Sequence, residues 1–313
     1  MMFDNLTLPI KNVLVGILVI LVLASIIVQT LKRSKPQMNL AEVSARINTW
    51  WVMAFVFAAA LLFGKIMSIG LFAFMSALAL REYFSMASIS KEFQSIKIWV
   101  YLAIPIHYYW VYINWYGMFI IFIPVFMFLF LPGRFVLAGQ VHGYLRNISV
   151  VQWGLMMSTF CLSHVSYLIT LSHKTDLTAS GPGLVLYLVF LSQFNDVSQF
   201  LFGKMFGRHK VSPLVSPKKT YEGLAGGLMV TTLLASLLGP YLTPMNLGYS
   251  IGSGVLISLS GFIGDISISA IKRDVGIKDS GSLLPGHGGI LDRVDSLYYT
   301  APLFFHYIYY LYY

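Results

Sequence analysis

Long apolar runs separated by short polar segments dominate this chain of 313 residues. A helix of about 20 apolar residues is long enough to cross the hydrocarbon core of a bilayer. The pattern predicts ten such helices, with Pro and Gly in several of the gaps between them. The expected ranges are 12–31, 48–64, 67–86, 98–115, 117–132, 151–172, 183–203, 224–241, 249–272 and 296–313. The predicted fold class is therefore all-α, a polytopic membrane helical bundle of about ten spans.

The distribution of basic residues tests this list of spans independently of hydropathy. In a ten-span bundle only Lys11, Lys65 and Lys174, of the 21 Lys and Arg, fall in loops on one side. All the others fall on the opposite side, which the positive-inside rule makes cytoplasmic. We therefore predict that both termini lie outside and that the basic loops face the cytoplasm.

Composition agrees with a membrane protein and removes several other classes. Hydrophobic residues make up 57% of the chain and charged residues only 11%, whereas soluble domains carry about 25% charged residues. The single cysteine, Cys161, excludes an intramolecular disulfide and a cysteine-based metal cluster. The net charge of +9 is explained by the orientation signal and by contacts with anionic lipid or substrate, so we expect no nucleic-acid partner.

Acidic and basic residues gather at the predicted cytoplasmic ends of the last four spans. Asp265, Ser269 and Lys272 follow one another at i, i+4 and i+7 and so share one face of a helix. Asp265 lies about two turns inside its span, where ionisable groups usually face a polar cavity. Asp292 and Asp295 share a face of the last helix if that helix begins before them.

Each feature also has a simpler explanation when it is taken alone. Asp265 could be a hydrogen-bonded residue of the bundle, and Lys272-Arg273 could be a pair of flanking charges that only sets orientation. Membrane packing does not explain acids, bases and glycines at this density. Carboxylates bind divalent cations, Lys and Arg neutralise phosphate oxygens, and glycines at a helix start let phosphate reach backbone N–H groups. The combination is typical of phosphoryl or nucleotidyl transfer, in which positioning and charge neutralisation supply most of the catalysis.

Two segments carry a resemblance to a known family. The first resembles the signature of the CDP-diglyceride synthetase (phosphatidate cytidylyltransferase) family and consists of Ser269, Lys272-Arg273, Lys278-Asp279, Pro285, His287-Gly288-Gly289, Asp292-Arg293 and Asp295. The second is similar to an upstream motif of the same family and consists of Asn195-Asp196, Gly203-Lys204, Phe206-Gly207, Ser216-Pro217-Lys218-Lys219-Thr220 and Glu222-Gly223. The motifs cover roughly 195–295, and the N-terminal half matches only in hydropathy. We accordingly divide the chain into an N-terminal transmembrane region, 1–150, and a C-terminal transmembrane catalytic region, 151–313.

The resemblance implies a nucleotidyltransferase of phospholipid biosynthesis. In this family the phosphate of phosphatidic acid attacks the α-phosphorus of CTP, which releases pyrophosphate and leaves CDP-diacylglycerol. By resemblance, Asp265 and Asp292 would bind Mg²⁺, together with a second cation such as K⁺. The implied catalytic residues are Asp265, Ser269, Lys272, Arg273 and Asp292. The implied substrate-binding residues are Asn195, Asp196, Ser216, Lys218, Lys219, His287, Gly288, Gly289 and Arg293.

One departure from the family pattern leaves the lipid open. Many members have a small residue and then Tyr shortly after Asn-Asp, whereas this chain reads Val197-Ser198-Gln199-Phe200. Gln199 lies one turn from Asp196, so it would line the same cavity. The alternatives are a CTP-dependent enzyme acting on another lipid, either a cytidylyltransferase or a lipid kinase, and, less favoured, a transporter. We expect a bacterial inner membrane location with the active site facing the cytoplasm, and the sequence leaves the oligomeric state open, a homodimer included.

Overall fold

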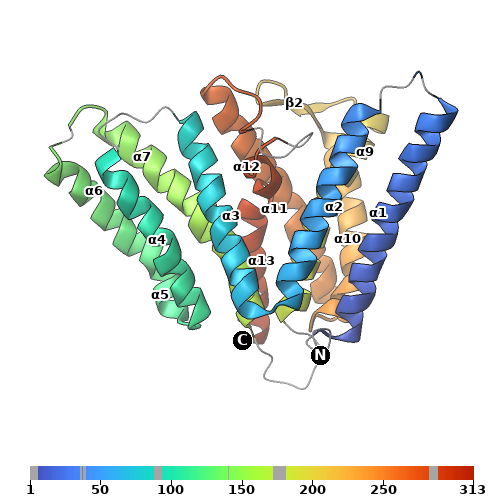
Figure 1. The fold of residues 1–313 in the computed structure, drawn as a ribbon, viewed down its shortest axis with the longest axis horizontal. Helices are drawn as coiled ribbons and strands as arrows, with labels where there is room; N and C mark the ends of the chain where they lie inside the picture. The colour runs from blue at the N-terminus through green and yellow to red at the C-terminus, as the bar shows by residue number, and fades with distance from the viewer. Residues whose placement is uncertain are drawn as a thin grey trace.

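The computed structural model describes residues 6–35, 37, 40–87, 94–139, 141–171, 181–281 and 288–313. These ranges are almost entirely helical (Figure 1), which confirms the predicted all-α class. The strands in the described residues are β1 (Lys210–Ser212) and β2 (Ser216–Thr220), which pair as one antiparallel hairpin.

The helices follow the predicted spans closely. Their bounds are α1 Leu8–Ser34, α2 Ala41–Leu62, α3 Lys65–Met86, α4 Gln94–Tyr112, α5 Tyr116–Ile121, α6 Phe128–Leu137, α7 Tyr144–Leu155, α8 Leu162–Thr170, α9 Gly181–Phe206, α10 Tyr221–Leu242, α11 Leu247–Asp274, α12 Leu291–Val294 and α13 Leu297–Tyr312. Two π-helical segments, η2 (Phe122–Met127) and η3 (Met156–Cys161), join α5 to α6 and α7 to α8. The fifth and sixth predicted spans are therefore single helical units, Tyr116–Leu137 and Tyr144–Thr170.

Eight helical units in the described residues are long and apolar enough to cross a membrane. The other two predicted spans correspond to α4 and α13, and α13 has only 16 residues, fewer than the roughly 20 that a full crossing needs. The protein is a multi-pass integral membrane protein. The division drawn at residue 150 falls inside the unit Tyr144–Thr170. The predicted span, 151–172, starts later than this helix because the first turn of α7 contains the polar residues Tyr144, Arg146 and Asn147.

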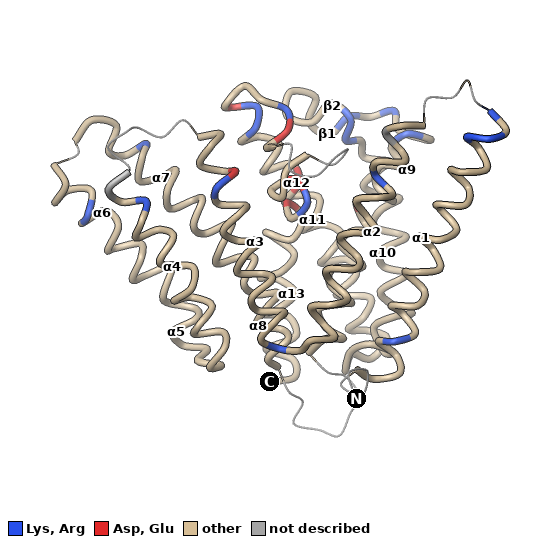
Figure 2. The backbone as a smooth tube through the Cα atoms, viewed as in Figure 1, with Lys and Arg blue, Asp and Glu red and all other residues tan. Residues whose placement is uncertain are grey.

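Charged residues gather at one end of the bundle (Figure 2), the end that also carries the hairpin and α12. Helices α4 to α7 form one side of the molecule, α1, α2, α9 and α10 form the other, and α3, α11 and α13 lie between them (Figure 1). The clustering agrees with the prediction that the basic loops share one side of the membrane.

Small and polar residues hold α9, α10 and α11 together. At Gly254 of α11 a Cβ would lie 2.8 Å from the Cα of Thr232 in α10, so the two backbones approach closely. Asn195 of α9 links all three helices: its Oδ1 accepts hydrogen bonds from Thr231 Oγ1 (3.1 Å) and Ser258 Oγ (2.8 Å). Its Nδ2 donates to the carbonyl of Ser258 at 3.4 Å. This link fixes the part of α9 that carries Asp196.

Candidate active site

Two lysine–carboxylate pairs lie at the charged end of the bundle. Lys219 of β2 pairs with Asp265 of α11, with 2.6 Å between Nζ and Oδ2. Lys272 of α11 pairs with Asp292 of α12, with 2.7 Å between Nζ and Oδ1. All four side chains are mostly shielded from solvent, with 7–23% of each exposed. Charged groups held this way in a partly dry site act more strongly on a phosphate than they would in water.

The first pair is supported by residues from two further positions. Ser269 Oγ donates to Asp265 Oδ1 at 3.3 Å, as expected for residues one turn apart on a helix. Lys219 Nζ also donates to Gln199 Oε1 at 3.0 Å. Burial lowers the pKa of Lys219, but the carboxylates of Asp265 and Asp196 outweigh that effect and raise it above its usual value. Lys219 is therefore an ammonium group at neutral pH.

The hairpin places Lys219 against α11. Its strands pair Lys210 with Thr220 and Ser212 with Ser216. Thr220 then caps α10, because its Oγ1 accepts the N–H of Gly223 at 3.1 Å. These contacts give the Ser-Pro-Lys-Lys-Thr segment a structural role. It forms the strand that carries Lys219, and its last residue, Thr220, caps the start of α10.

Glutamate and glycine residues of the same motif hold the hairpin in place. Glu222 accepts hydrogen bonds from the N–H groups of Arg208 (3.1 Å) and His209 (3.2 Å). At Gly203 of α9 a Cβ would lie 3.1 Å from Thr220 Oγ1, and at Gly223 it would lie 2.7 Å from the carbonyl oxygen of Gln199. Gly223 therefore has no room for a side chain, and a side chain at Gly203 would make a tight contact with Thr220.

Two further carboxylates act on Lys219. Asp196 has a buried Oδ1 with no hydrogen-bond donor in the described part of the chain. Asp295 follows α12, and its Oδ1 accepts the N–H of Ser296 at 2.8 Å. Burial, together with the charges of Asp265 and Asp196, raises the pKa of Asp295 well above its usual value. The charges of Asp265, Asp196 and Asp295 therefore all act on Lys219.

Asp292 accepts hydrogen bonds from four donors, one on α11 and three on Ser280 and Gly289. Its Oδ1 accepts from Lys272, and its Oδ2 accepts from Ser280 N (2.9 Å), Ser280 Oγ (2.8 Å) and Gly289 N (3.1 Å). Burial alone would raise the pKa of Asp292, but Lys272 and the backbone donors hold it below its usual value. Asp292 is therefore a carboxylate whose two oxygens are both hydrogen-bonded.

The other predicted residues are distributed around these pairs. Arg273 is exposed and donates to the carbonyls of Val215 (3.3 Å) and Ile277 (2.9 Å), so it holds the hairpin turn rather than an acid. Lys218 is exposed and Ser216 is half-buried at the start of β2. Gly288 has φ +78°, in the left-handed region that favours glycine. Arg293 has a buried Nε with no acceptor in the described part of the chain, and His287 lies outside the described residues.

Glu82 of α3 is a residue of this region that the motifs do not contain. Its carboxylate accepts the N–H groups of Ile290 (3.0 Å) and Leu291 (2.8 Å), next to Asp292. The available signal is that Glu82 is the one acidic residue within the second to fifth predicted spans. Ionisable residues inside a membrane span usually do work there.

The acids of this region offer oxygen ligands of the kind that bind metal ions. In the described ranges no three His, Cys, Asp or Glu side chains lie close enough together to hold one. The donor chemistry nevertheless fits a hard cation, because Asp265 and Asp196 supply carboxylate oxygens and one buried Asp196 oxygen has no donor. Asp265 and Asp292, the two ligands implied by resemblance, are each paired with a different lysine.

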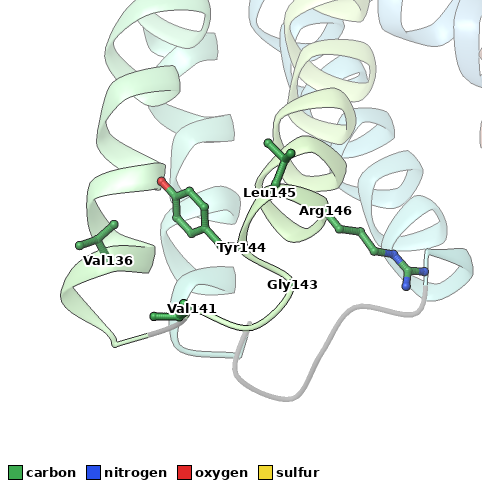
Figure 3. Close-up of a pocket in the computed structure, with 6 residues that line it drawn as sticks. All are labelled: Val136, Val141, Gly143, Tyr144, Leu145 and Arg146. Carbon is green, nitrogen blue, oxygen red and sulfur yellow. The ribbon is translucent and has the colours of Figure 1, made fainter.

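A hollow elsewhere in the molecule has none of this chemistry. It is an open depression of about 650 Å³ at the connection of α6 and α7 and is lined by Val136, Val141, Gly143, Tyr144, Leu145 and Arg146. Figure 3 shows that the Arg146 side chain points away from Tyr144 and Val136. Because the lining includes none of the paired acids and lysines, we place the site at the two pairs.

The helical architecture and the paired charges define a multi-pass membrane protein with a shielded charged site, and comparison with known proteins identifies its family. The sequence model described as the cytidylyltransferase family matches residues 44–311. The chain therefore belongs to the cytidylyltransferase family. This confirms the resemblance found in the motifs and the prediction of a nucleotidyltransferase.

Individual relatives differ in how much of the chain they match. The chain is 43% identical over 291 residues to the uncharacterized protein YnbB of Escherichia coli strain K12, covering 93% of this chain and 95% of that protein. It is 40% identical over 159 residues to the phosphatidate cytidylyltransferase of Staphylococcus aureus strain COL. It is 34% identical over 158 residues to that of Staphylococcus epidermidis. Each staphylococcal match covers 50% of this chain and 61% of the staphylococcal enzyme.

Proposed function

We propose that this protein is a phosphatidate cytidylyltransferase, which makes CDP-diacylglycerol and pyrophosphate from CTP and phosphatidic acid. The observation that carries the proposal is the presence of two shielded lysine–carboxylate pairs at one end of a membrane bundle. Both staphylococcal relatives bear the name of this activity. Lysine ammonium groups bind phosphate oxygens, and carboxylates bind the cations that accompany nucleotides.

The reaction needs charge neutralisation more than proton transfer. An ionised phosphate oxygen of phosphatidic acid forms a bond to the α-phosphorus of CTP, and the bond from that phosphorus to the β-phosphate oxygen breaks, releasing pyrophosphate. Lys219 and Lys272 would exchange their carboxylate partners for phosphate oxygens of the two substrates. Asp265 would then be free for Mg²⁺, which supplies neutralisation of the triphosphate charge when it is bound.

The remaining predicted roles fit around this centre as parts of the same proposal. Asp196 acts on the same lysine as Asp265 and is a further candidate metal ligand. Asp265 and Asp292 remain the ligands implied by resemblance, for Mg²⁺ and a second cation such as K⁺. Arg293, with its buried Nε, is available to an anionic substrate. Lys218, Ser216, His287 and Gly288-Gly289 would complete the phosphate contacts. Asn195 would act mainly by holding α9, because both ends of its amide are hydrogen-bonded between helices.

The position of the site suits one soluble and one membrane substrate. CTP comes from water and phosphatidic acid lies in the bilayer, so their phosphates meet at the membrane surface. The pairs lie at the charged end of the bundle, which we propose is the cytoplasmic end in a bacterial inner membrane.

A second candidate is a CTP-dependent enzyme that acts on another lipid phosphate. It is favoured by one observation: Gln199 contacts Lys219 at a position where many family members have another residue. The family assignment is the same in both cases, and only the lipid differs.

The direct experiment uses purified protein in detergent with labelled CTP, Mg²⁺ and phosphatidic acid. We expect label in the lipid phase as CDP-diacylglycerol and equimolar pyrophosphate in the aqueous phase. A panel of other lipid phosphates and alcohols is run beside it. Transfer of CDP to another lipid with none to phosphatidic acid would support the second candidate. Transfer of a single phosphate would show a lipid kinase and overturn the proposal.

A further inference from the structure

We propose that Glu82, in the N-terminal half of the chain, is a positioning residue that holds the loop carrying Asp292. The structural part of this inference stands on contacts alone. Its effect on turnover rests on the proposed function. Glu82 belongs to α3, a helix that lies outside both sequence motifs.

The carboxylate of Glu82 binds the backbone where α12 begins. Oε1 accepts the N–H of Ile290 at 3.0 Å, and Oε2 accepts the N–H of Leu291 at 2.8 Å. These are first-turn N–H groups, which have no acceptor within a helix. A carboxylate from α3 therefore supplies what α12 lacks.

The same loop binds Asp292 from the other direction. Gly289 N donates to Asp292 Oδ2, so three consecutive N–H groups, from 289 to 291, are shared between the carboxylates of Asp292 and Glu82. Ser280 Oγ lies 2.8 Å from Asp292 Oδ2 and 3.3 Å from Glu82 Oε2. Its single proton favours the shorter bond. The donors between the two acids offset their mutual repulsion.

Glycines leave room for this arrangement. At Gly281 a Cβ would lie 3.1 Å from Glu82 Oε1. At Gly289 a Cβ would run into Glu82 Oε2 and lie 2.5 Å from Ser280 Oγ. The loop is thus shaped around the Glu82 carboxylate, and the predicted phosphate-binding glycine Gly289 has a second, structural reason to be glycine.

The consequence for the site passes through Asp292. Asp292 is the partner of Lys272, so the loop that Glu82 holds also sets the position of that lysine's partner. If Glu82 loses its charge, two N–H groups lose a carboxylate acceptor and the loop loosens locally. A residue that only stabilised the bundle would lower stability without selectively moving this loop.

The test compares Glu82→Gln with Arg81→Gln, an exposed neighbour on the same helix that makes no contact with these groups in the described ranges. Gln keeps the size of Glu but presents an NH₂ group to one of the two N–H donors. Hydrogen bonds to charged groups are strong enough that we expect kcat to fall about 10- to 100-fold, with KM within about threefold of wild type. Arg81→Gln should leave both unchanged. Glu82→Asp, which keeps the charge on a shorter side chain, should recover part of kcat.

A second readout does not require any substrate. Ile290→Cys in a Cys161→Ser background reports on the loop by its rate of reaction with a soluble thiol reagent in detergent. We expect Glu82→Gln to raise this rate about tenfold, because local opening exposes the segment, and Arg81→Gln to leave it unchanged. Equal rates in Glu82→Gln and the parent would overturn the positioning role. If wild type makes no CDP-lipid, the proposed function fails while the labelling result still decides the role of Glu82. If Glu82→Gln does not fold, Glu82→Ala, which removes the carboxylate altogether, is labelled in its place, and an unchanged rate there would equally overturn the proposal.

Discussion

The ammonium group of Lys219 lies 2.6 Å from the carboxylate of Asp265 and so joins the hairpin to α11. The two residues belong to different elements. The contact therefore forms only when the hairpin, which connects α9 to α10, packs against α11. Under the proposed function a nucleotide phosphate would bind Lys219 and its cation would bind Asp265, which would separate the pair. The pair is therefore the natural place to test the mechanism.

Removing the charge of Asp265 should abolish turnover. Loss of a ligand for a catalytic cation costs at least about 10³-fold in rate. Asp265→Asn should therefore fall by at least that factor in the CDP-lipid assay, while Asp274→Asn, an exposed acid at the end of the same helix, stays near wild type. Chelation of divalent cations should silence wild type, and added Mg²⁺ should restore it. Retention of more than about a tenth of activity by Asp265→Asn would make this residue structural.

Asp292→Asn should reduce stability as well as activity. The substitution leaves Lys272 without its charged partner in a buried place, and breaking such a pair typically costs about 3 kcal/mol or more. We expect a clearly lower melting temperature in detergent for Asp292→Asn than for Asp265→Asn, whose partner Lys219 keeps Gln199 and neighbouring acids. Equal melting temperatures for the two variants would show that the Lys272 pair contributes little to the fold.

Gln199 should influence the choice of lipid more than the chemistry. Gln199→Leu removes the acceptor 3.0 Å from Lys219 while keeping a side chain of similar size. We expect the ratio of kcat/KM for phosphatidic acid to that for other lipid phosphates to change at least threefold, a difference of about 0.7 kcal/mol. Gln193→Leu, on the same helix, is the matched control. An unchanged ratio with unchanged kcat would remove Gln199 from the determinants of specificity.

Topology can be tested with cysteines placed on exposed residues. In a Cys161→Ser background, Lys210→Cys and Asp279→Cys should be protected from an impermeant thiol reagent in intact cells, and Leu247→Cys should react. Ser280 would be a poor reporter because it is buried. Reaction of Asp279→Cys from outside the cell would reverse the proposed orientation, and with it the side on which CTP binds.

Hydropathy located all eight helical units of the described residues that can cross a membrane, because lipid imposes the same requirement on each helix, whatever its neighbours. It misplaced the start of α7, where Tyr144, Arg146 and Asn147 are helical but polar. Helical spacing correctly placed Ser269 on the face of Asp265. The same spacing could not show that Lys272 pairs with Asp292, because that contact depends on how a loop returns to α11.

The contacts that sequence could not supply are all between distant elements. The hairpin β1–β2 carries Lys219 on only a few paired residues, too short for a pattern in the sequence. Arg273 binds the carbonyl of Val215 because the hairpin turn lies beside the end of α11, which local spacing does not encode. The role of Glu82 could not be predicted from the motifs, because it binds mainly backbone N–H groups, which every sequence provides.

The hold of Glu82 on residues 290 and 291 also bears on exchanging parts between relatives. A chimaera that keeps the motifs 195–295 of this chain but takes its first half from another family member would inherit intact catalytic side chains. Its loop at residues 290 and 291 would nevertheless be held only if the new α3 carries an acidic residue at the position of Glu82. The same contact must form between two coexpressed halves of the chain. Recovery of turnover after such a split therefore reports whether α3 packs against this loop as it does in the intact protein.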